Sequence, residues 1–368
     1  MVVEAAQVMR PTDLDDLLAM DRDDVLSVAL NTDPARPENQ AAHPAYQIWL
    51  TNALRDLLAE LPARRRRQAR PTVERVTHYV ATWKPAGRGI ALFAARGLWR
   101  TLTLQVPLPH RVRYGQPDVT AVLEALDEHR PYAILAVDHR RARLALGYLG
   151  NATLLAEEKL DLHTEYWRRT TGRRPTAARR LGEGAGRGNQ HDEFDARLEA
   201  HYRAFWEHVA HEAERAMAAR GLDRLVIGGP AEAASAVARL LPPDRRRTVV
   251  ATVPLPLYRG LPEMLRRTLQ VAVEAERRRD RALVADALEA AGSQRAVLGW
   301  PAVHEALRVG QVHALVVDRT VLARHPELPR SARAAGARLE LVDADAAAPL
   351  HAHGGIAALL RHPTSRGG

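Results

Sequence analysis

One stretch of the chain lacks a hydrophobic face altogether, and it limits how the rest can fold. Residues 167–190 contain seven arginines and a glycine-rich tip, and Glu183 is their only acidic residue. A segment of this length without an apolar stripe cannot form a core helix or a core strand, and loops this long are usually functional or disordered. We therefore expect a long basic loop between two regularly patterned parts of the chain.

The length and the patterning on both sides of this loop predict a multidomain α/β (α+β) protein. A chain of 368 residues is enough for about two or three domains of ordinary size. We expect a central β-α-β middle domain that bears the long basic loop. The expected divisions are an N-terminal extension at 1–43, an N-terminal α+β domain at 44–130, a middle domain at 131–270 and a C-terminal α/β domain at 271–368.

In the first third of the chain, apolar residues recur in some segments at helical spacing and in others at every second position. Apolar residues at helical spacing predict a helical stretch at 14–26 and a helix near 48–61, whereas alternation predicts a strand at 76–83. Two further apolar runs on either side of Arg96-Gly97 predict a hairpin. A helix at 119–128 closes this part.

The remaining patterning predicts parallel sheets with helical crossovers. An apolar run at 133–137 with a partner at 143–149 predicts a strand pair, and an amphipathic helix resumes near Phe194. Strand, helix and strand then follow between residues 225 and 253, which predicts a parallel β-α-β unit. A long helix at 261–291 leads to a final group of elements that ends in a helix from Ile356.

Arginine dominates the charge of the chain. Lys and Arg total 53 against 44 acidic residues, for a net charge of +9, and only two of the 53 are lysines. The guanidinium fork fits phosphate and stacks on bases, which makes nucleic acid the first partner to consider, although a codon bias would also enrich arginine. The absence of cysteine excludes disulfides, thiolate catalysis and Cys-ligated zinc.

The sequence carries no targeting or membrane signal that we recognise. Its first residues lack the basic and then apolar order of a signal peptide, and no apolar run approaches the ~18 residues of a membrane helix. We expect a cytoplasmic protein that does not contact membranes.

Two patterns suggest metal or phosphate sites, but each has a simpler explanation. His208 with His211 and His351 with His353 lack a third ligand and the His-Glu-x-x-His spacing, so solvated histidines are favoured over a metal site. Gly228-Gly229-Pro230 lacks the spacing of a phosphate loop, so a structural turn is favoured. We expect neither a metal nor a cofactor.

The basic loop is the strongest functional signal. Its arginines repel one another unless a polyanion neutralises them, so we expect the loop to become ordered on RNA or DNA, with an uninvolved disordered linker as the alternative. A second basic run, on the N-terminal domain, is also predicted to bind RNA. The predicted RNA-binding residues are Arg168, Arg169, Arg173, Arg174, Arg179, Arg180 and Arg187 in the loop, and Arg64, Arg65, Arg66 and Arg67 in the second run.

The loop ends in Gly186-Arg-Gly-Asn-Gln190, which resembles the Gly-Arg-Gly-Gly-Gln loop of the archaeal and eukaryotic class I release factor and Pelota superfamily. The elements that follow are similar in order to those of that superfamily, including its bacterial branch, over about residues 132–361. The similarity extends to a C-terminal α/β domain like that of kink-turn-binding ribosomal proteins.

This resemblance implies a ribosome-associated translation factor that enters the A site. Gly188, Asn189 and Gln190 would then reach the peptidyl-transferase centre, where in the family this element helps to place a water molecule against the peptidyl-tRNA ester. Asn189 replaces a glycine of that motif. Because the Asn-Ile-Lys-Ser and cysteine-containing motifs of stop-codon reading are absent, we do not expect termination at stop codons.

The leading hypothesis is a stress or hibernation factor on stalled or idle ribosomes, similar to the Balon-like hibernation factors or to rescue-type members. Its implied partners are ribosomal RNA at the decoding and peptidyl-transferase centres and a translational GTPase such as elongation factor Tu. Two alternatives stay open. One is a peptidyl-tRNA hydrolase that rescues stalled ribosomes, and the other is a general protein that binds structured RNA.

Overall fold

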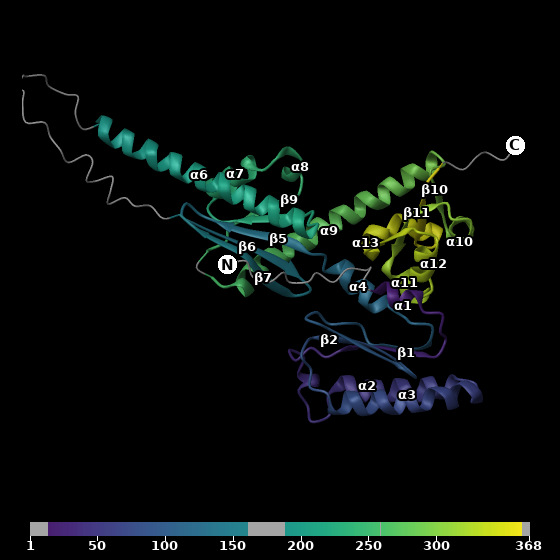
Figure 1. Ribbon diagram of the computed structural model, residues 1–368. Helices are drawn as coiled ribbons and strands as arrows, with labels where there is room; N and C mark the ends of the chain where they lie inside the picture. Colours follow the sequence, from purple (N-terminus) through teal and green to yellow (C-terminus); the bar gives the residue numbers. More distant parts are fainter. Residues whose placement is uncertain (1–13, 161–187, 258, 363–368) are drawn as a thin grey trace, which may run out of the picture. The chain divides into compact units, whose positions relative to one another are not determined.

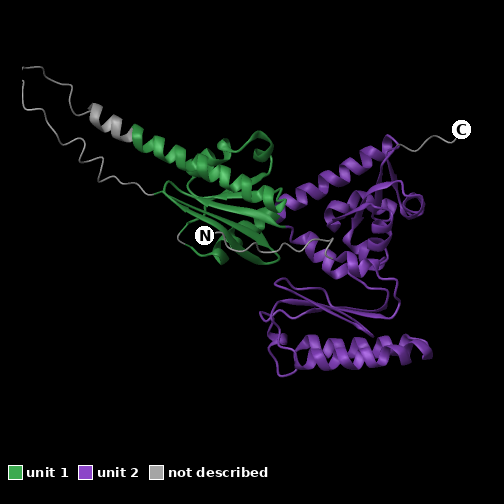
Figure 2. Ribbon diagram, in the orientation of Figure 1, with its two compact units in different colours: residues 1–8, 131–272 green, residues 9–130, 273–368 purple. Residues whose placement is uncertain are grey.

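The computed structural model describes residues 14–160, 188–257 and 259–362, and residues 188–195 by their backbone alone. Within these residues the strands form three sheets, each accompanied by helices, so the predicted multidomain α/β fold is confirmed (Figure 1). The chain divides into two compact units (Figure 2). Among the described residues, 131–272 make up the first unit, and 14–130 together with 273–362 make up the second. The four domain ranges given above remain a prediction.

The first unit is built on a five-stranded mixed sheet with the order β7-β6-β5-β8-β9. β5, β6 and β7 pair antiparallel, whereas β5, β8 and β9 pair parallel, so the expected hairpin and the β-α-β unit are both present. The strands are β5 (Tyr132–Val137), β6 (Arg141–Tyr148), β7 (Asn151–Lys159), β8 (Leu225–Gly228) and β9 (Val249–Val253).

Helices cover both faces of this sheet. The helices are α6 (Gly188–Arg220), α7 (Ala231–Leu240), α8 (Pro243–Arg246) and the start of α9 (Leu261–Gly292). Successive side chains of a strand point to opposite faces, so Leu135 packs in the core with α6 and α7, and Ile134 packs in the core with α9. Because β5 is covered on both sides, it consists entirely of buried residues.

The second unit contains two four-stranded sheets. The first has the order β3-β2-β1-β4 and is antiparallel in every pair. Its strands are β1 (Val25–Asn31), β2 (Gly89–Ala95), β3 (Leu98–Leu104) and β4 (Arg111–Gly115), and its helices are α2 (Ala45–Glu60), α3 (Ala63–Thr82) and α4 (Thr120–Glu128), with the short α1 (Asp15–Ala19) and η2 (Pro37–Asn39). Side chains of α2 and α3, among them Leu50, Leu54 and Val76, pack with Leu92 of β2 to form its core.

The second sheet of this unit has the order β10-β13-β11-β12 and packs against the end of α9, where Val284 and Ala287 are buried. β11 and β12 are parallel, and the other pairs are antiparallel. The strands are β10 (Ala296–Leu298), β11 (Val312–Asp318), β12 (Arg338–Val342) and β13 (Ile356–Leu360). The helices are α10 (Trp300–Arg308), α11 (Arg319–Arg324), α12 (Leu328–Ala334), α13 (Ala344–Ala347) and η3 (Ala348–His353).

The strand predicted at 76–83 is wrong, because these residues belong to helix α3. Ala69, Val73, Val76 and Val80 are the buried residues of this helix. Their spacing of three and four is helical, and the alternation seen in the sequence arises from polar residues that lie on the exposed side.

Two further elements differ from expectation. Residues 25–31, which the sequence placed partly in a helical stretch and wholly in an extension, form β1 between β2 and β4. The run from Ile356 forms strand β13 between β10 and β11 and is not a helix. Both segments are short apolar runs, and periodicity alone does not distinguish a buried strand from a buried helix.

Candidate functional site

Gly188, Asn189 and Gln190 form the first turn of helix α6. The sequence predicted a loop up to Gln190 and a helix only from about Phe194, so the helix begins earlier than expected. The seven predicted RNA-binding arginines between Arg168 and Arg187 lie outside the described residues.

The C-terminal part of α6 is fixed to its sheet. Phe205, Val209, Ala213 and Met217 are buried at helical spacing against the strands. The indole Nε1 of Trp206 donates a hydrogen bond of 3.0 Å to the backbone carbonyl of Asp138, after the end of β5. This combination of apolar contacts and a directed hydrogen bond sets both the position and the rotation of the helix.

The contact of the same helix with this core ends near Tyr202, which is half-buried and packs against the core. Between residues 196 and 204 no side chain is buried, and burial begins at Phe205. An α-helix rises about 1.5 Å per residue, so Gln190 lies roughly 22 Å along the helix from Phe205. The Gly-Asn-Gln element therefore stands at the end of a helical arm.

The start of a helix has a definite chemistry. The first four backbone N–H groups of a helix have no acceptor within it, and the aligned peptide dipoles place partial positive charge there. At α6 these groups belong to the turn that begins with Gly188. Such a turn attracts anions such as phosphate, and its N–H groups are suited to stabilising an oxyanion.

The second predicted RNA-binding run, Arg64 to Arg67, lies in the first turns of α3, where its members differ in role. Arg66 donates hydrogen bonds to the carbonyls of Ala59 and Leu61 at 2.9 and 3.1 Å. It thereby provides a donor for carbonyl groups at the end of α2. Arg65 donates to the carbonyl of Asp23 at 2.7 Å. Arg64 and Arg67 are exposed and have no ion pair or hydrogen bond among the residues that the structure describes, which leaves them available for a polyanion.

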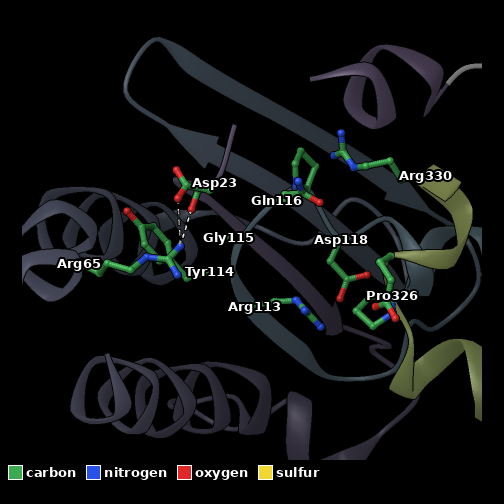
Figure 3. Close-up of a pocket in the computed structure, with 11 residues that line it drawn as sticks. Asp23, Arg65, Arg113, Tyr114, Gly115, Gln116, Asp118, Pro326 and Arg330 are labelled. Carbon is green, nitrogen blue, oxygen red and sulfur yellow. Dashed lines mark hydrogen bonds and ion pairs between the residues drawn. The ribbon is translucent and has the colours of Figure 1, made fainter. Parts of the chain in front are cut away.

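Arg65 also lines a pocket that the sequence did not indicate (Figure 3). Its guanidinium lies 5.3 Å from the centre of the Tyr114 ring. The cavity has a volume of about 300 Å³ and is also lined by Arg113 and Arg330. Three acidic residues balance these arginines, namely Asp23, Asp118 and Glu327. Because the lining is neutral overall, the pocket by itself is not an anion site.

The glycine turn after β8 is structural, as the sequence favoured. Gly229 has φ +140°, and a Cβ at this position would overlap the carbonyl oxygen of Val137. The N–H of Gly229 donates to the carbonyl of Val253 at 3.1 Å, so it is not free to bind phosphate.

Two of the four histidines named in the sequence analysis have an acidic neighbour. His208 lies 3.9 Å from Glu158, and His351 lies 2.9 Å from the buried Asp318 carboxylate. Within the described part of the chain, no group of three or more His, Asp or Glu side chains could hold a metal ion. No described helix is long and apolar enough to cross a membrane.

Comparison with protein families gives one match. Residues 117–277, a little under half of the chain, match the model of bacterial archaeo-eukaryotic release factor family 10. This match confirms the resemblance to the release factor and Pelota superfamily, in its bacterial branch. A search of curated proteins gives no match.

Several solved structures also match the chain. The archaeal translation termination factor aRF1 is 18% identical, with 96% of this chain and 99% of that chain covered and a TM-score of 0.28. Archaeal Pelota, in a model of ribosome-bound Pelota and ABCE1, is 15% identical, with 99% and 96% covered and a TM-score of 0.47. Dom34 of S. cerevisiae, a translation termination-like factor that interacts with Hbs1, is 12% identical, with 73% and 76% covered and a TM-score of 0.44.

Proposed function

We propose that this chain, which belongs through residues 117–277 to the bacterial branch of the release factor and Pelota superfamily, acts on ribosomes. It binds the A site of stalled or idle ribosomes in the cytoplasm and inserts Gly188, Asn189 and Gln190 into the peptidyl-transferase centre. The observation that carries this proposal is the helical arm. The Gly-Asn-Gln element lies roughly 22 Å along α6 from the first residue that the core buries.

A rigid arm suits insertion into a narrow, RNA-lined space. The buried face from Phe205 to Met217 fixes the direction of α6, so little conformational entropy is lost when its end is bound. The positive end of the helix favours the phosphate-rich surroundings. The predicted loop arginines, from Arg168 to Arg187, would neutralise further phosphates on the way in.

The exposed arginines of α3 provide a second contact in this proposal. Arg64 and Arg67 would bind ribosomal RNA near the decoding centre, whereas Arg65 and Arg66 hold the protein's own backbone. A translational GTPase such as elongation factor Tu is the proposed protein partner.

Sedimentation with ribosomes tests this function. Purified full-length chain is mixed with ribosomes from a stationary-phase extract at near-physiological salt and separated on a sucrose gradient. We expect the chain in the ribosomal fractions, and we expect an A-site tRNA to displace it. A chain that stays at the top of the gradient, or that binds naked structured RNA in preference to ribosomes, contradicts the proposal.

Peptidyl-tRNA hydrolysis is the second candidate, because Gly188 and Gln190 match the family motif and only Asn189 departs from it. In this function Gln190 orders the attacking water and a backbone N–H of the turn stabilises the oxyanion. Hydrolysis would be supported if the wild type releases peptide from stalled ribosomes, if Gln190→Ala loses this activity and if Asn189→Gly keeps it. Binding without release, in wild type and both variants alike, would leave occupancy of the site as the function.

A further inference from the structure

We propose that Arg75, Tyr79, Trp83 and Trp99, called the Trp99 surface below, bind unpaired nucleotides of RNA by stacking. The inference rests on the proposed function, because it takes RNA as the partner, but it requires nothing of Gly188 to Gln190. It assigns a further place at which the chain recognises RNA, with bases in addition to phosphates as the recognised groups.

The position of Trp99 is unusual for a large apolar side chain. It lies on β3, an edge strand of its sheet, and 38% of its surface is exposed. Its partner across the ladder is Ala94, which is buried in the core beneath α2 and α3. The indole therefore points to the helix-covered side of the sheet, at its edge, where the cover is incomplete. Thr101 and Thr103 follow on the same side of β3 and are also exposed.

Neighbouring side chains hold the indole in place. The guanidinium of Arg75 lies over the Trp99 ring, 4.6 Å from its centre. Arg75 in turn donates to the carbonyls of Ala95 and Leu98, each at 3.0 Å, on either side of the turn between β2 and β3. Tyr79 meets the same indole edge to face at 5.0 Å. An exposed but immobilised indole offers a stacking surface that costs little entropy to occupy.

The aromatic surface continues along α3. Tyr79 and Trp83 stack at 6.4 Å with 24° between their planes, and both are half-buried. Three aromatic rings thus run from the edge of β3 to the end of α3. Single-stranded RNA is bound in this way, with successive bases on aromatic or guanidinium planes, because every base has a π face.

Charge decides between RNA and an apolar protein segment as the occupant. Of the six arginines of helix α3, Arg75 belongs to this surface and the other five lie nearer the start of the helix, and the exposed Lys84 directly follows the helix. The core of a protein–protein interface is normally depleted of charged residues, whereas aromatic rings among cationic side chains are typical of single-stranded nucleic acid sites. The surface therefore matches a flexible polyanion that carries bases.

The test measures binding of the full chain to a labelled, unstructured RNA oligonucleotide by fluorescence anisotropy at near-physiological salt. Removal of one stacking partner typically weakens binding roughly 5- to 150-fold, so we expect that loss in Trp99→Ala and near-wild-type binding in Trp99→Phe. Thr101→Ala, on the same side of β3, is the matched control and should bind as wild type does. Far-ultraviolet circular dichroism checks that each variant is folded.

Two results would overturn the inference. One is equal affinity of wild type and Trp99→Ala for the oligonucleotide. The other is a preference of the wild type for duplex RNA of the same length, which presents phosphates without free bases. Capture of an apolar peptide on this surface, lost in Trp99→Ala while RNA binding persists, would also overturn it.

Gradient sedimentation of the same proteins separates this inference from the proposed function. If the wild type sediments with ribosomes and Trp99→Ala binds the oligonucleotide unchanged, stacking fails and the ribosomal function stands. If the wild type stays off ribosomes but binds the oligonucleotide through Trp99, the ribosomal function fails and the stacking site stands.

Discussion

The Nε atom of Arg130 lies 3.1 Å from Oε1 of Glu276, and both residues belong to the second unit, close to positions 130 and 273 where the chain leaves and re-enters it. Arg130 also contacts the carboxylates of Asp127 at 2.8 Å and Glu340 at 3.1 Å. Burial lowers the pKa of Arg130, but the three carboxylates more than offset this and raise it overall. The guanidinium thus joins α4, α9 and β12 within the second unit.

Replacement of this arginine should destabilise the second unit. Arg130→Met leaves Asp127 and Glu276, both largely buried, without their shared cation, and we expect the free energy of unfolding to fall by about 3 kcal/mol. Urea unfolding followed by circular dichroism measures this loss. Arg308→Met, which breaks an exposed pair with Glu305, is the control and should leave the urea midpoint essentially unchanged, because solvent screens an exposed ion pair. Equal stabilities of the two variants would contradict the role of Arg130.

Asp280 should make the stability of this region depend on pH. Burial raises its pKa to about 6, helped by the charges of Asp127 and Glu276 and opposed by a hydrogen bond from the backbone N–H of Asp343 and by Arg319. The folded state therefore holds a proton that the unfolded state releases near pH 4. Stability falls as pH rises from about 4 to about 6, because unfolding releases this proton and a higher pH favours its release.

The neutral variant Asp280→Asn isolates this effect. At pH 7.5 it lacks the buried charge, so we expect it to be more stable than wild type by about 1–3 kcal/mol. Near pH 4 wild-type Asp280 is itself neutral in the folded state, and the two proteins should be about equally stable. A difference that stays constant across this range, measured by urea unfolding, would show that the effect is not one of charge.

Alanine variants of Gly229 and Gly97 allow the cost of backbone strain to be compared with and without a steric clash. Both have positive φ, at +140° and +74°, but a Cβ at Gly229 meets the Val137 carbonyl and one at Gly97 meets nothing within 4 Å. We expect Gly97→Ala to cost about 1–2 kcal/mol from strain alone and Gly229→Ala about 3 kcal/mol or more. Thermal unfolding of the two variants ranks them, and equal costs would show that the β8–α7 turn relaxes around a methyl group.

Variants of different arginines between Arg64 and Arg67 should affect different properties, either ribosome binding or the stability of the fold. The double variant Arg64→Gln, Arg67→Gln should keep its unfolding midpoint but bind ribosomes more weakly. Its slope of log affinity against log salt should be smaller by about 1–2, as two phosphate contacts are lost. Arg66→Gln should instead destabilise the end of α2, where it bonds to Ala59 and Leu61, and should leave the salt slope unchanged. The opposite pattern would reassign these arginines.

Much of the first unit could be predicted from the sequence because its pattern is local. The continuous apolar run of β5 and the strand, helix and strand from β8 to β9 need no knowledge of distant residues. β7 was missed because an edge strand with a single buried residue shows little alternation. β1 was missed because complete burial removes the alternation altogether.

The candidate site could be predicted only in part, for a related reason. Gly188, Asn189 and Gln190 are identifiable by motif, but whether they end a loop or begin a helix depends on where α6 nucleates. The separate roles of Arg64 and Arg66 depend on carbonyls that the fold brings within reach. Arg113 and Arg330 lie more than two hundred positions apart, and only the completed second unit places them around one pocket.

The position of β13 bears on how the protein is made. This strand lies between β10 and β11, and β10 pairs with no other strand of its sheet. A ribosome that synthesises this chain must therefore add Leu360 before the sheet can close, and until then β10 and β11 present open edges. Synthesis halted shortly before Ile356 would release a polypeptide prone to aggregation, however well its earlier parts had folded.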